Sequence, residues 1–227
     1  SAYSSYSGCR QYLENMERAR AEVGPGAPEL VKLRPYYDHP GFVAPLADGL
    51  RAALAEAAPA GTGGEAGGGA TRVLMTAHSI PEAQAATCAY ESQLQATGAQ
   101  VAARAGLSPG TWDLVYQSRS GPPTQPWLGP DIITAIDEAP ASTSVVIAVP
   151  IGFVSDHMEV VYDLDVQAAE AARRRGVGFL RTATPGVDPR FVAMVSDLVD
   201  EAEAAGPGPA AGSICATPGC CPPPAAR

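Results

Sequence analysis

Short apolar segments alternate with helical segments along most of this chain, and this alternation is the feature that most restricts its fold. The apolar segments lie at residues 72–77, 112–117, 144–150 and 178–182. Each is short enough for a buried strand and is followed by apolar residues at helical spacing. Strands that are joined by helices pair in parallel and are covered on both faces. The sequence therefore predicts an α/β fold with a doubly wound, mainly parallel sheet.

The segments between these strands carry the helical pattern. We expect helices at residues 11–23, 42–58, 82–98, 131–139, 156–175 and 189–205. Residues 61–70 are rich in glycine and nearly lack apolar side chains, which predicts a surface loop. The opening SAYSSYSGCRQY has neither an initiator Met nor a signal-peptide pattern. We interpret it as a strand and its loop, and the whole sequence as the C-terminal portion of a longer protein.

Composition and charge exclude several classes of protein. A net charge of -9, from 15 basic and 24 acidic residues, disfavours binding to nucleic acids and to anionic membranes. The longest apolar run, residues 145–154, is well short of the ~18 residues that cross a bilayer. The 5 cysteines do not have the spacing of a disulfide framework. We therefore expect a protein without transmembrane segments in a reducing, cytoplasmic compartment.

Polar segments follow three of the predicted strands. They are His78-Ser79, residues 117–119 and residues 155–159. In doubly wound sheets, ligands bind at the carboxyl ends of the strands, so these segments form the main candidate site. Imidazole is the side-chain type that titrates near neutrality, which makes His78 a candidate base or metal ligand. From this residue alone, a turn histidine that only forms hydrogen bonds is an equal alternative.

The predicted helix at residues 156–175 begins with a row of polar side chains. Glu159, Asp163 and Gln167 recur every four residues and therefore share one helix face, whereas Asp156 and Asp165 fall on other faces. Such a row of oxygen ligands suits the passage of a labile divalent cation or of protons. The alternative is a solvent-exposed face, which is the usual role of charged runs.

Residues 116–130, YQSRSGPPTQPWLGP, form a loop stiffened by proline and glycine. A rigid loop that holds Arg119 and Trp127 suits a flat, anionic ligand. An ordinary connection whose tryptophan fills the core is an equal alternative. The sequence contains no Walker loop, GxGxxG turn or GxSxG elbow, so the kinase, dinucleotide-binding and serine-hydrolase classes lose their usual support.

Three motifs together resemble those of the ferrochelatases in order and spacing. They are TAHSIP at residues 76–81, YQSRSGPPTQPWLGP at residues 116–130, and PIGFVSDHMEVVYDLD at residues 150–165. The resemblance implies two similar α/β lobes with a porphyrin cleft between them. By this resemblance, the chain comprises the end of the first lobe (1–30), the second lobe with the metal-insertion site (31–187), a helix packing back on the first lobe (188–205) and a cysteine-containing tail (206–227).

The resemblance also implies an activity and the residues that carry it. Ferrochelatases are lyases of heme biosynthesis that insert Fe2+ into a porphyrin with release of two protons. By resemblance, His78 abstracts protons and faces the iron, Glu159 is its partner across the cleft, and Asp163 continues an acidic metal path. Gln167 departs from the family, in which a carboxylate is common at this point. Tyr12 resembles a porphyrin-contacting tyrosine.

The cysteines carry a second resemblance, to ferrochelatases that hold a [2Fe-2S] cluster. Cys9, Cys215, Cys220 and Cys221 match the cysteine distribution of those proteins, and four thiolates satisfy a cluster. The C-x4-C-C spacing is unusual, so zinc and no metal are alternatives. Cys88 is expected to act as a small buried hydrophobe.

Bacterial members with the cluster resemble enzymes that metallate coproporphyrin III to coproheme, so coproporphyrin III is the expected substrate. A protoporphyrin IX ferrochelatase that forms protoheme is the first alternative. A non-catalytic tetrapyrrole-binding module is an alternative from another class. A cobalt chelatase fits less well, because the loop at residues 117–130 is longer than in those enzymes.

Overall fold

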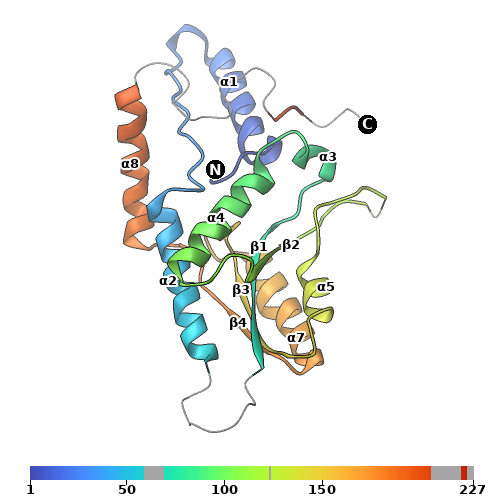
Figure 1. The fold of residues 1–227 in the computed structure, drawn as a ribbon. Helices are drawn as coiled ribbons and strands as arrows, with labels where there is room; N and C mark the ends of the chain where they lie inside the picture. The colour runs from blue at the N-terminus through green and yellow to red at the C-terminus, as the bar shows by residue number, and fades with distance from the viewer. Residues whose placement is uncertain (59–68, 123, 206–220, 224–227) are drawn as a thin grey trace.

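The strands form one parallel sheet in the computed structural model, which describes residues 1–58, 69–122, 124–205 and 221–223 (Figure 1). Within these residues the strands are β1 (Ala70–His78), β2 (Trp112–Gln117), β3 (Thr143–Val149) and β4 (Gly178–Arg181). Their order is β2-β1-β3-β4, and every pair is parallel. The predicted α/β fold with a parallel sheet is therefore confirmed.

Helices cover both faces of this sheet. The α-helices are α1 (Gln11–Val23), α2 (Pro40–Ala57), α3 (Glu82–Ala85), α4 (Tyr90–Arg104), α5 (Ile132–Asp137), α6 (Met158–Val160), α7 (Ala169–Arg175) and α8 (Pro189–Ala205). Two π-helical segments, η1 (Tyr6–Arg10) and η3 (Val161–Ala168), and a short 3-10 helix, η2 (Gly24–Gly26), complete the described elements. Figure 1 shows α2, α4 and α8 on one side of the sheet and α5 and α7 on the other.

The core consists of two apolar clusters, one on each face of the sheet. Successive strand residues point to opposite faces, so Met75 packs with Phe42 of α2 whereas Leu74 packs with Ile136 of α5 and Leu164 of η3. A strand buried on both faces needs apolar residues at consecutive positions. This requirement explains the unbroken apolar runs of the sequence.

The single helix expected at residues 82–98 is wrong. The structure has two helices, α3 and α4, with a turn at residues 86–89, and α4 continues past Gly98 to Arg104. Gly98 lies within the helix because a residue without a side chain is needed there to make room for Trp112. A Cβ at this position would lie 2.6 Å from the Trp112 ring. The side chain of Tyr90 fixes the start of α4, since its hydroxyl donates to the carbonyl of His78 at 2.9 Å.

The continuous α-helix expected at residues 156–175 is also wrong. Helical structure begins two residues later, in α6, and the chain then passes through the π-helix η3 before α7. Apolar periodicity does not distinguish these forms, because both place apolar residues on one side. π-Helical segments are rare and occur often at functional sites.

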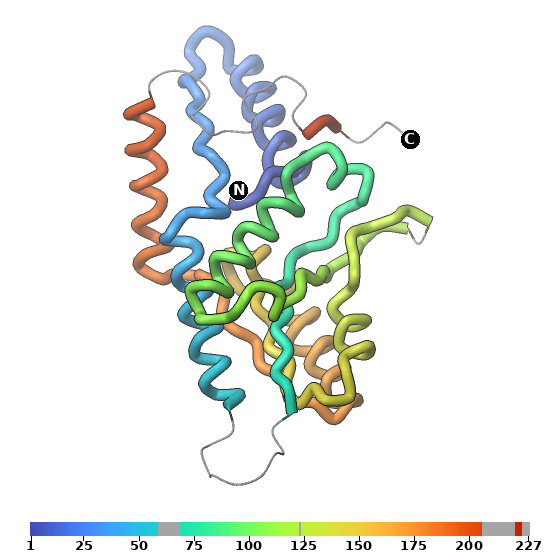
Figure 2. The backbone as a smooth tube through the Cα atoms, in the orientation of Figure 1, coloured from blue at the N-terminus to red at the C-terminus, as the bar shows by residue number. Residues whose placement is uncertain are grey.

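The opening residues do not form the expected strand. Residues 2–5 are buried instead as an irregular segment against α4 and the loop after β3. The Ser4 N–H donates to Gln93 Oε1 at 2.7 Å, and the Tyr3 hydroxyl donates to the Ile151 carbonyl at 2.8 Å. Figure 2 shows this dark blue segment beside the green α4. Side-chain hydrogen bonds to distant residues therefore replace strand pairing here.

The helix expected at residues 11–23 is confirmed as α1, yet α1 buries none of its own side chains. The last helix, α8, packs on α2. The expected division into lobes stays a prediction. None of the helices in the described ranges combines the length and apolar character that crossing a membrane requires.

Replacing Tyr3 with Phe tests the buried opening segment. Burial raises the pKa of Tyr3, so the phenol stays protonated in the folded protein where the unfolded chain ionises. The stability that this group confers is complete below pH ~10 and falls above it by about 1.4 kcal/mol per pH unit. We expect Tyr3→Phe to lower the free energy of unfolding by about 1–2 kcal/mol at neutral pH and to make its alkaline decline shallower.

Denaturant titrations at neutral and alkaline pH measure both effects. Tyr162→Phe is the control, because Tyr162 is 51% exposed and makes no comparable buried hydrogen bond in the described structure. A Tyr3→Phe protein with an unchanged alkaline decline would contradict the buried phenol.

Candidate active site

Backbone hydrogen bonds align the carboxyl ends of three strands. His78 and Gln117 are register partners at the ends of β1 and β2, and the Ser79 N–H donates to the Gln117 carbonyl at 2.8 Å. On the other side of β1, the Gly152 N–H donates to the Thr76 carbonyl at 3.0 Å. The polar segments that follow β1 and β2 therefore meet at one edge of the sheet.

The loop after β3 approaches β1 very closely. A Cβ on Gly152 would lie 2.6 Å from the Cα of Ala77 and 3.4 Å from the backbone nitrogen of His78. Only a residue without a side chain fits this space. Gly152 therefore lets the β3 loop lie directly against the backbone that carries His78.

The imidazole of His78 has a defined orientation. Its Nδ1 lies 2.5 Å from the carbonyl oxygen of Ser79. A carbonyl oxygen only accepts hydrogen bonds, so Nδ1 carries the proton and Nε2 carries the lone pair of the neutral ring. The side chain is half-buried, which leaves this lone pair available to a ligand or a proton.

His78 lines a cavity of about 450 Å³. The opening segment forms one wall, with Tyr3, Ser5 and Ser7, and the segment after β1 forms another. The other lining residues are Ser1, Gly8, Ser79, Ile80, Pro81, Gln84, Tyr90, Ser120, Trp127 and Gly152. Among these described lining residues, imidazole is the one side-chain type that takes up protons near neutrality.

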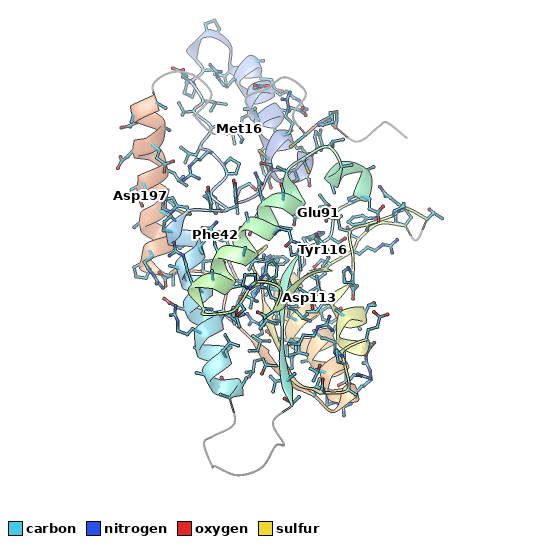
Figure 3. The ribbon with its side chains drawn as sticks, viewed as in Figure 1. Met16, Phe42, Glu91, Asp113, Tyr116 and Asp197 are labelled. Atoms are coloured by element: carbon cyan, nitrogen blue, oxygen red, sulfur yellow. The ribbon has the colours of Figure 1, made fainter. Side chains whose placement is uncertain are left out.

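The tyrosines near His78 are hydrogen-bond donors rather than bases. Burial raises the pKa of Tyr3 and that of Tyr90 above the ordinary value. Burial also raises the pKa of Tyr116, and Glu91, which accepts from its hydroxyl at 3.3 Å, raises it further (Figure 3). No local sequence pattern places these tyrosines near His78, because they are separated from it along the chain.

The loop between β2 and α5 packs against the segment that follows His78. The Ser79 hydroxyl donates to the Leu128 carbonyl at 2.8 Å, and the Leu128 N–H donates to the Ile80 carbonyl at 3.0 Å. Arg119 donates to two carbonyls of its own loop, both at 3.1 Å, and therefore closes the loop on itself. Trp127 is half-buried and lines the His78 cavity, and its contact with a ligand stays a prediction.

Asp163 lies next to the end of β2. Its Oδ2 accepts hydrogen bonds from the Ser118 hydroxyl and, at 3.5 Å, from Gln117 Nε2. Glu159, four residues earlier, is exposed and makes no hydrogen bond or ion pair within the described part of the chain. The exposed Gln167 lies further along η3. The predicted polar row therefore contains one carboxylate held by the protein and one open to solvent.

Tyr12 lies at a second, larger cavity. This cavity of about 680 Å³ lies between α1, residues 30–36 and α8, and its lining is mainly apolar. Tyr12 is 61% exposed, and Met16, labelled in Figure 3, lines the cavity from the same helix. Ser1 and Gly8 line both cavities, so the two adjoin. Tyr12 and His78 therefore lie at neighbouring parts of one hollowed surface.

The cysteines are only partly described. Cys9 in η1 and Cys221 are both buried, whereas Cys215 and Cys220 lie outside the described residues. Cys88 is half-buried, and its thiol donates to the Ala85 carbonyl at 3.7 Å. Residues 1–58, 69–122, 124–205 and 221–223 contain no group of three or more His, Cys, Asp or Glu side chains placed to hold a metal ion. The cluster stays a prediction.

These features define an α/β protein whose candidate ligand site lies at the carboxyl edge of a parallel sheet. The protein-family model named Ferrochelatase matches residues 1–203 of this chain. The chain therefore belongs to the ferrochelatase family. The family resemblance inferred from the three motifs is confirmed.

Similar proteins include ferrochelatases from several bacteria. The chain is 50% identical over 206 residues to the ferrochelatase of Rhodopirellula baltica, covering 88% of this chain and 55% of that protein. It is 46% identical over 210 residues to the coproporphyrin III ferrochelatase of Nocardia farcinica, covering 88% and 57%. The coproporphyrin III ferrochelatase of Mycobacterium bovis is 44% identical over 225 residues, covering 94% and 62%.

The chain spans a little over half the length of these curated relatives. A solved structure of a putative cobalamin biosynthesis CbiX protein from Marinobacter aquaeolei VT8 aligns with 60% of the chain at 15% identity and a TM-score of 0.40. This similarity is too low to support a conclusion about function.

Replacing Gly152 with Ala tests the close approach at the sheet edge. The new methyl group would meet backbone atoms of β1, so we expect a loss of about 1–3 kcal/mol in the free energy of unfolding. Gly26→Ala is the control, since no atom lies within 4 Å of a Cβ built there. Chemical denaturation measures both variants. Equal stabilities would contradict the packing of the β3 loop on β1.

Proposed function

We propose that this chain carries the metal-insertion site of a ferrochelatase that inserts Fe2+ into coproporphyrin III to give coproheme and two protons. Membership of the ferrochelatase family and the names of the relatives support the reaction and the substrate. The observation that carries the proposal is the orientation of His78. Its Nε2 lone pair belongs to a half-buried ring beside a cavity that adjoins a larger apolar one.

His78 is the proposed proton acceptor. Two pyrrole N–H protons must leave the macrocycle when iron binds, and a base within hydrogen-bond reach accelerates that step. Nε2 takes a pyrrole proton and the ring becomes an imidazolium, while the Nδ1–H bond to Ser79 is kept in both states. The proton then passes to water, which returns the neutral ring for the second transfer. The fixed Nδ1 contact therefore orients the ring throughout the cycle.

Glu159 is the proposed carboxylate partner of His78. Its side chain is exposed and makes no hydrogen bond in the described structure, so both oxygens are open to a hydrated cation. Fe2+ accepts carboxylate oxygen and imidazole nitrogen as ligands. Asp163 is already hydrogen-bonded to Ser118, which suits it to passing a hydrated ion toward Glu159 rather than to holding it.

The larger apolar cavity is the proposed seat of the macrocycle. Porphyrins are flat and largely apolar, and apolar or aromatic side chains contact such ligands best. Tyr12, Leu13 and Met16 line the cavity from α1, and Met194 and Leu198 line it from α8. A macrocycle on α1 that extends toward the adjoining cavity would bring its nitrogens toward His78.

The four cysteines Cys9, Cys215, Cys220 and Cys221 are the proposed ligands of a [2Fe-2S] cluster. The burial of Cys9 and Cys221 supports this, because buried thiolate sites exclude solvent from a bound cluster. When bound, such a cluster supplies one-electron redox chemistry and cross-links the tail to η1. No step of the insertion reaction passes through it.

Variants of the complete polypeptide test the site. We expect His78→Ala to reduce the rate of iron insertion by about 10²–10⁴-fold, the usual contribution of a general base, while the thermal unfolding profile is kept. Glu159→Gln is expected to reduce it as well, because the neutral amide attracts Fe2+ less strongly. Anaerobic assays that follow the loss of coproporphyrin III fluorescence with Fe2+ measure the rates.

Glu170→Gln is the matched control for Glu159, because Glu170 lies further along the same helical run and pairs with Arg173. Insertion at the wild-type rate by a folded His78→Ala protein would contradict the role of His78. Faster metallation of protoporphyrin IX than of coproporphyrin III would identify the other substrate. Tight porphyrin binding without insertion by the wild-type protein would indicate a non-catalytic binding module.

Cysteine variants test the cluster separately. We expect Cys9→Ser and Cys221→Ser each to abolish the visible absorption of the iron-sulfur chromophore in anaerobically purified protein. Cys88→Ser is the control and should keep the full absorption, because Cys88 contacts the Ala85 carbonyl in a local turn. Unchanged spectra in Cys9→Ser or Cys221→Ser would exclude the substituted cysteine as a ligand.

A further inference from the structure

The end of β4 places Arg181 against the acidic segment, which we define as residues 156–165. Arg181 donates to the two oxygens of Asp165 at 2.5 and 3.0 Å. It also donates to the two oxygens of Asp156, at 3.1 and 3.2 Å. Its side chain is only 17% exposed, and paired contacts between a guanidinium and carboxylates are directional. Arg181 is therefore a fixed cation that joins two points of the acidic segment.

The two partners of Arg181 bracket the proposed iron-binding residues. Asp156 precedes α6 and Asp165 lies in η3, whereas Glu159 and Asp163 lie between them. Thr184 adds a hydrogen bond to Asp156 at 2.9 Å. π-Helical turns are rare, so we expect contacts from outside the helix to help hold the eight residues of η3 in this form. The Arg181 contacts span the α6–η3 junction and supply such a restraint.

The carboxylates of the acidic segment fall into two groups, those that other side chains bind and one that they leave open. Of its four acidic side chains, Asp156 and Asp165 are bound to Arg181 and Asp163 is bound to Ser118. Within the described residues, Glu159 is the one without a hydrogen bond or ion pair. A cation that reaches the segment therefore meets Glu159 as its one unengaged carboxylate.

We propose that Arg181 is a positioning residue for iron: it holds η3 in its π-helical form and keeps Asp156 and Asp165 from the cation, so that Glu159 is the carboxylate presented to Fe2+. This inference rests on the proposed function. The sequence held one signal for it, a charged residue at the carboxyl end of the last strand. Arg181 touches neither porphyrin nor iron and acts through Asp156 and Asp165.

Steady-state kinetics of Arg181→Met in the complete polypeptide test the inference, with Fe2+ and coproporphyrin III varied separately. We expect the KM for Fe2+ to rise by about 10–100-fold, as for other residues that orient metal ligands, with little change in the KM for the porphyrin. Arg181→Lys keeps the charge but loses the paired contacts, so an intermediate KM is expected. A variant that is only less stable would instead have lower activity, without a selective rise in the KM for Fe2+ over the KM for the porphyrin.

Arg173→Met is the control, because Arg173 forms a surface ion pair with Glu170 at 2.7 Å on α7 and does not contact the acidic segment. It should keep the wild-type KM for Fe2+. If Arg181→Met does not fold, Asp165→Asn removes the same contact from the other side and is expected to raise the KM for Fe2+ too. An unchanged KM for Fe2+ in folded Arg181→Met, or in Asp165→Asn, would overturn the inference.

Calorimetry with Co2+ in the absence of porphyrin separates this inference from the proposed function. If the wild-type protein inserts no iron, the proposed function fails. A Co2+ affinity that falls in Arg181→Met would still support the positioning role. A Co2+ affinity equal to that of the wild type would overturn it.

Discussion

The candidate site depends on the parallel pairing of β1 with a neighbour on each side. β2 and β3 flank β1, and backbone hydrogen bonds continue past its end to Ser79 and from Gly152. Side chains alternate along a strand, so a shift of β1 by one residue would turn His78 to the opposite face of the sheet. The two pairings therefore fix both the position of His78 along the strand direction and the face of the sheet on which its imidazole lies.

In the proposed mechanism, the group that takes protons and the groups that handle the cation come from different strand ends. His78 stands at the end of β1, with Nδ1 held by Ser79 and buried tyrosines nearby that remain protonated. The carboxylates come from α6 and η3, after β3, where Arg181 binds two of them. In the proposed reaction, His78 takes the proton on a nitrogen atom, so the proton does not compete with the cation for the carboxylate oxygens.

The sequence was sufficient for the strands and for the position of His78, because buried parallel strands need unbroken apolar runs and polar residues mark their ends. It was insufficient where long-range contacts decide the local form. The π-helix η3 has the apolar periodicity of an ordinary helix, and Gly98 has the sequence signal of a helix end although it makes room for Trp112. The hydrogen bond from Tyr3 to Ile151 joins residues too far apart in sequence for any local pattern to indicate it.

A measurement of the His78 tautomer tests the proposed role of this residue as proton acceptor most directly. Nitrogen NMR of the complete polypeptide labelled at histidine suits this, because a His78 variant assigns the signal. For the neutral form of the His78 ring, we predict a proton at Nδ1 and a lone pair at Nε2. A neutral ring protonated at Nε2 would contradict the account, because the proposed proton acceptor would then already hold a proton.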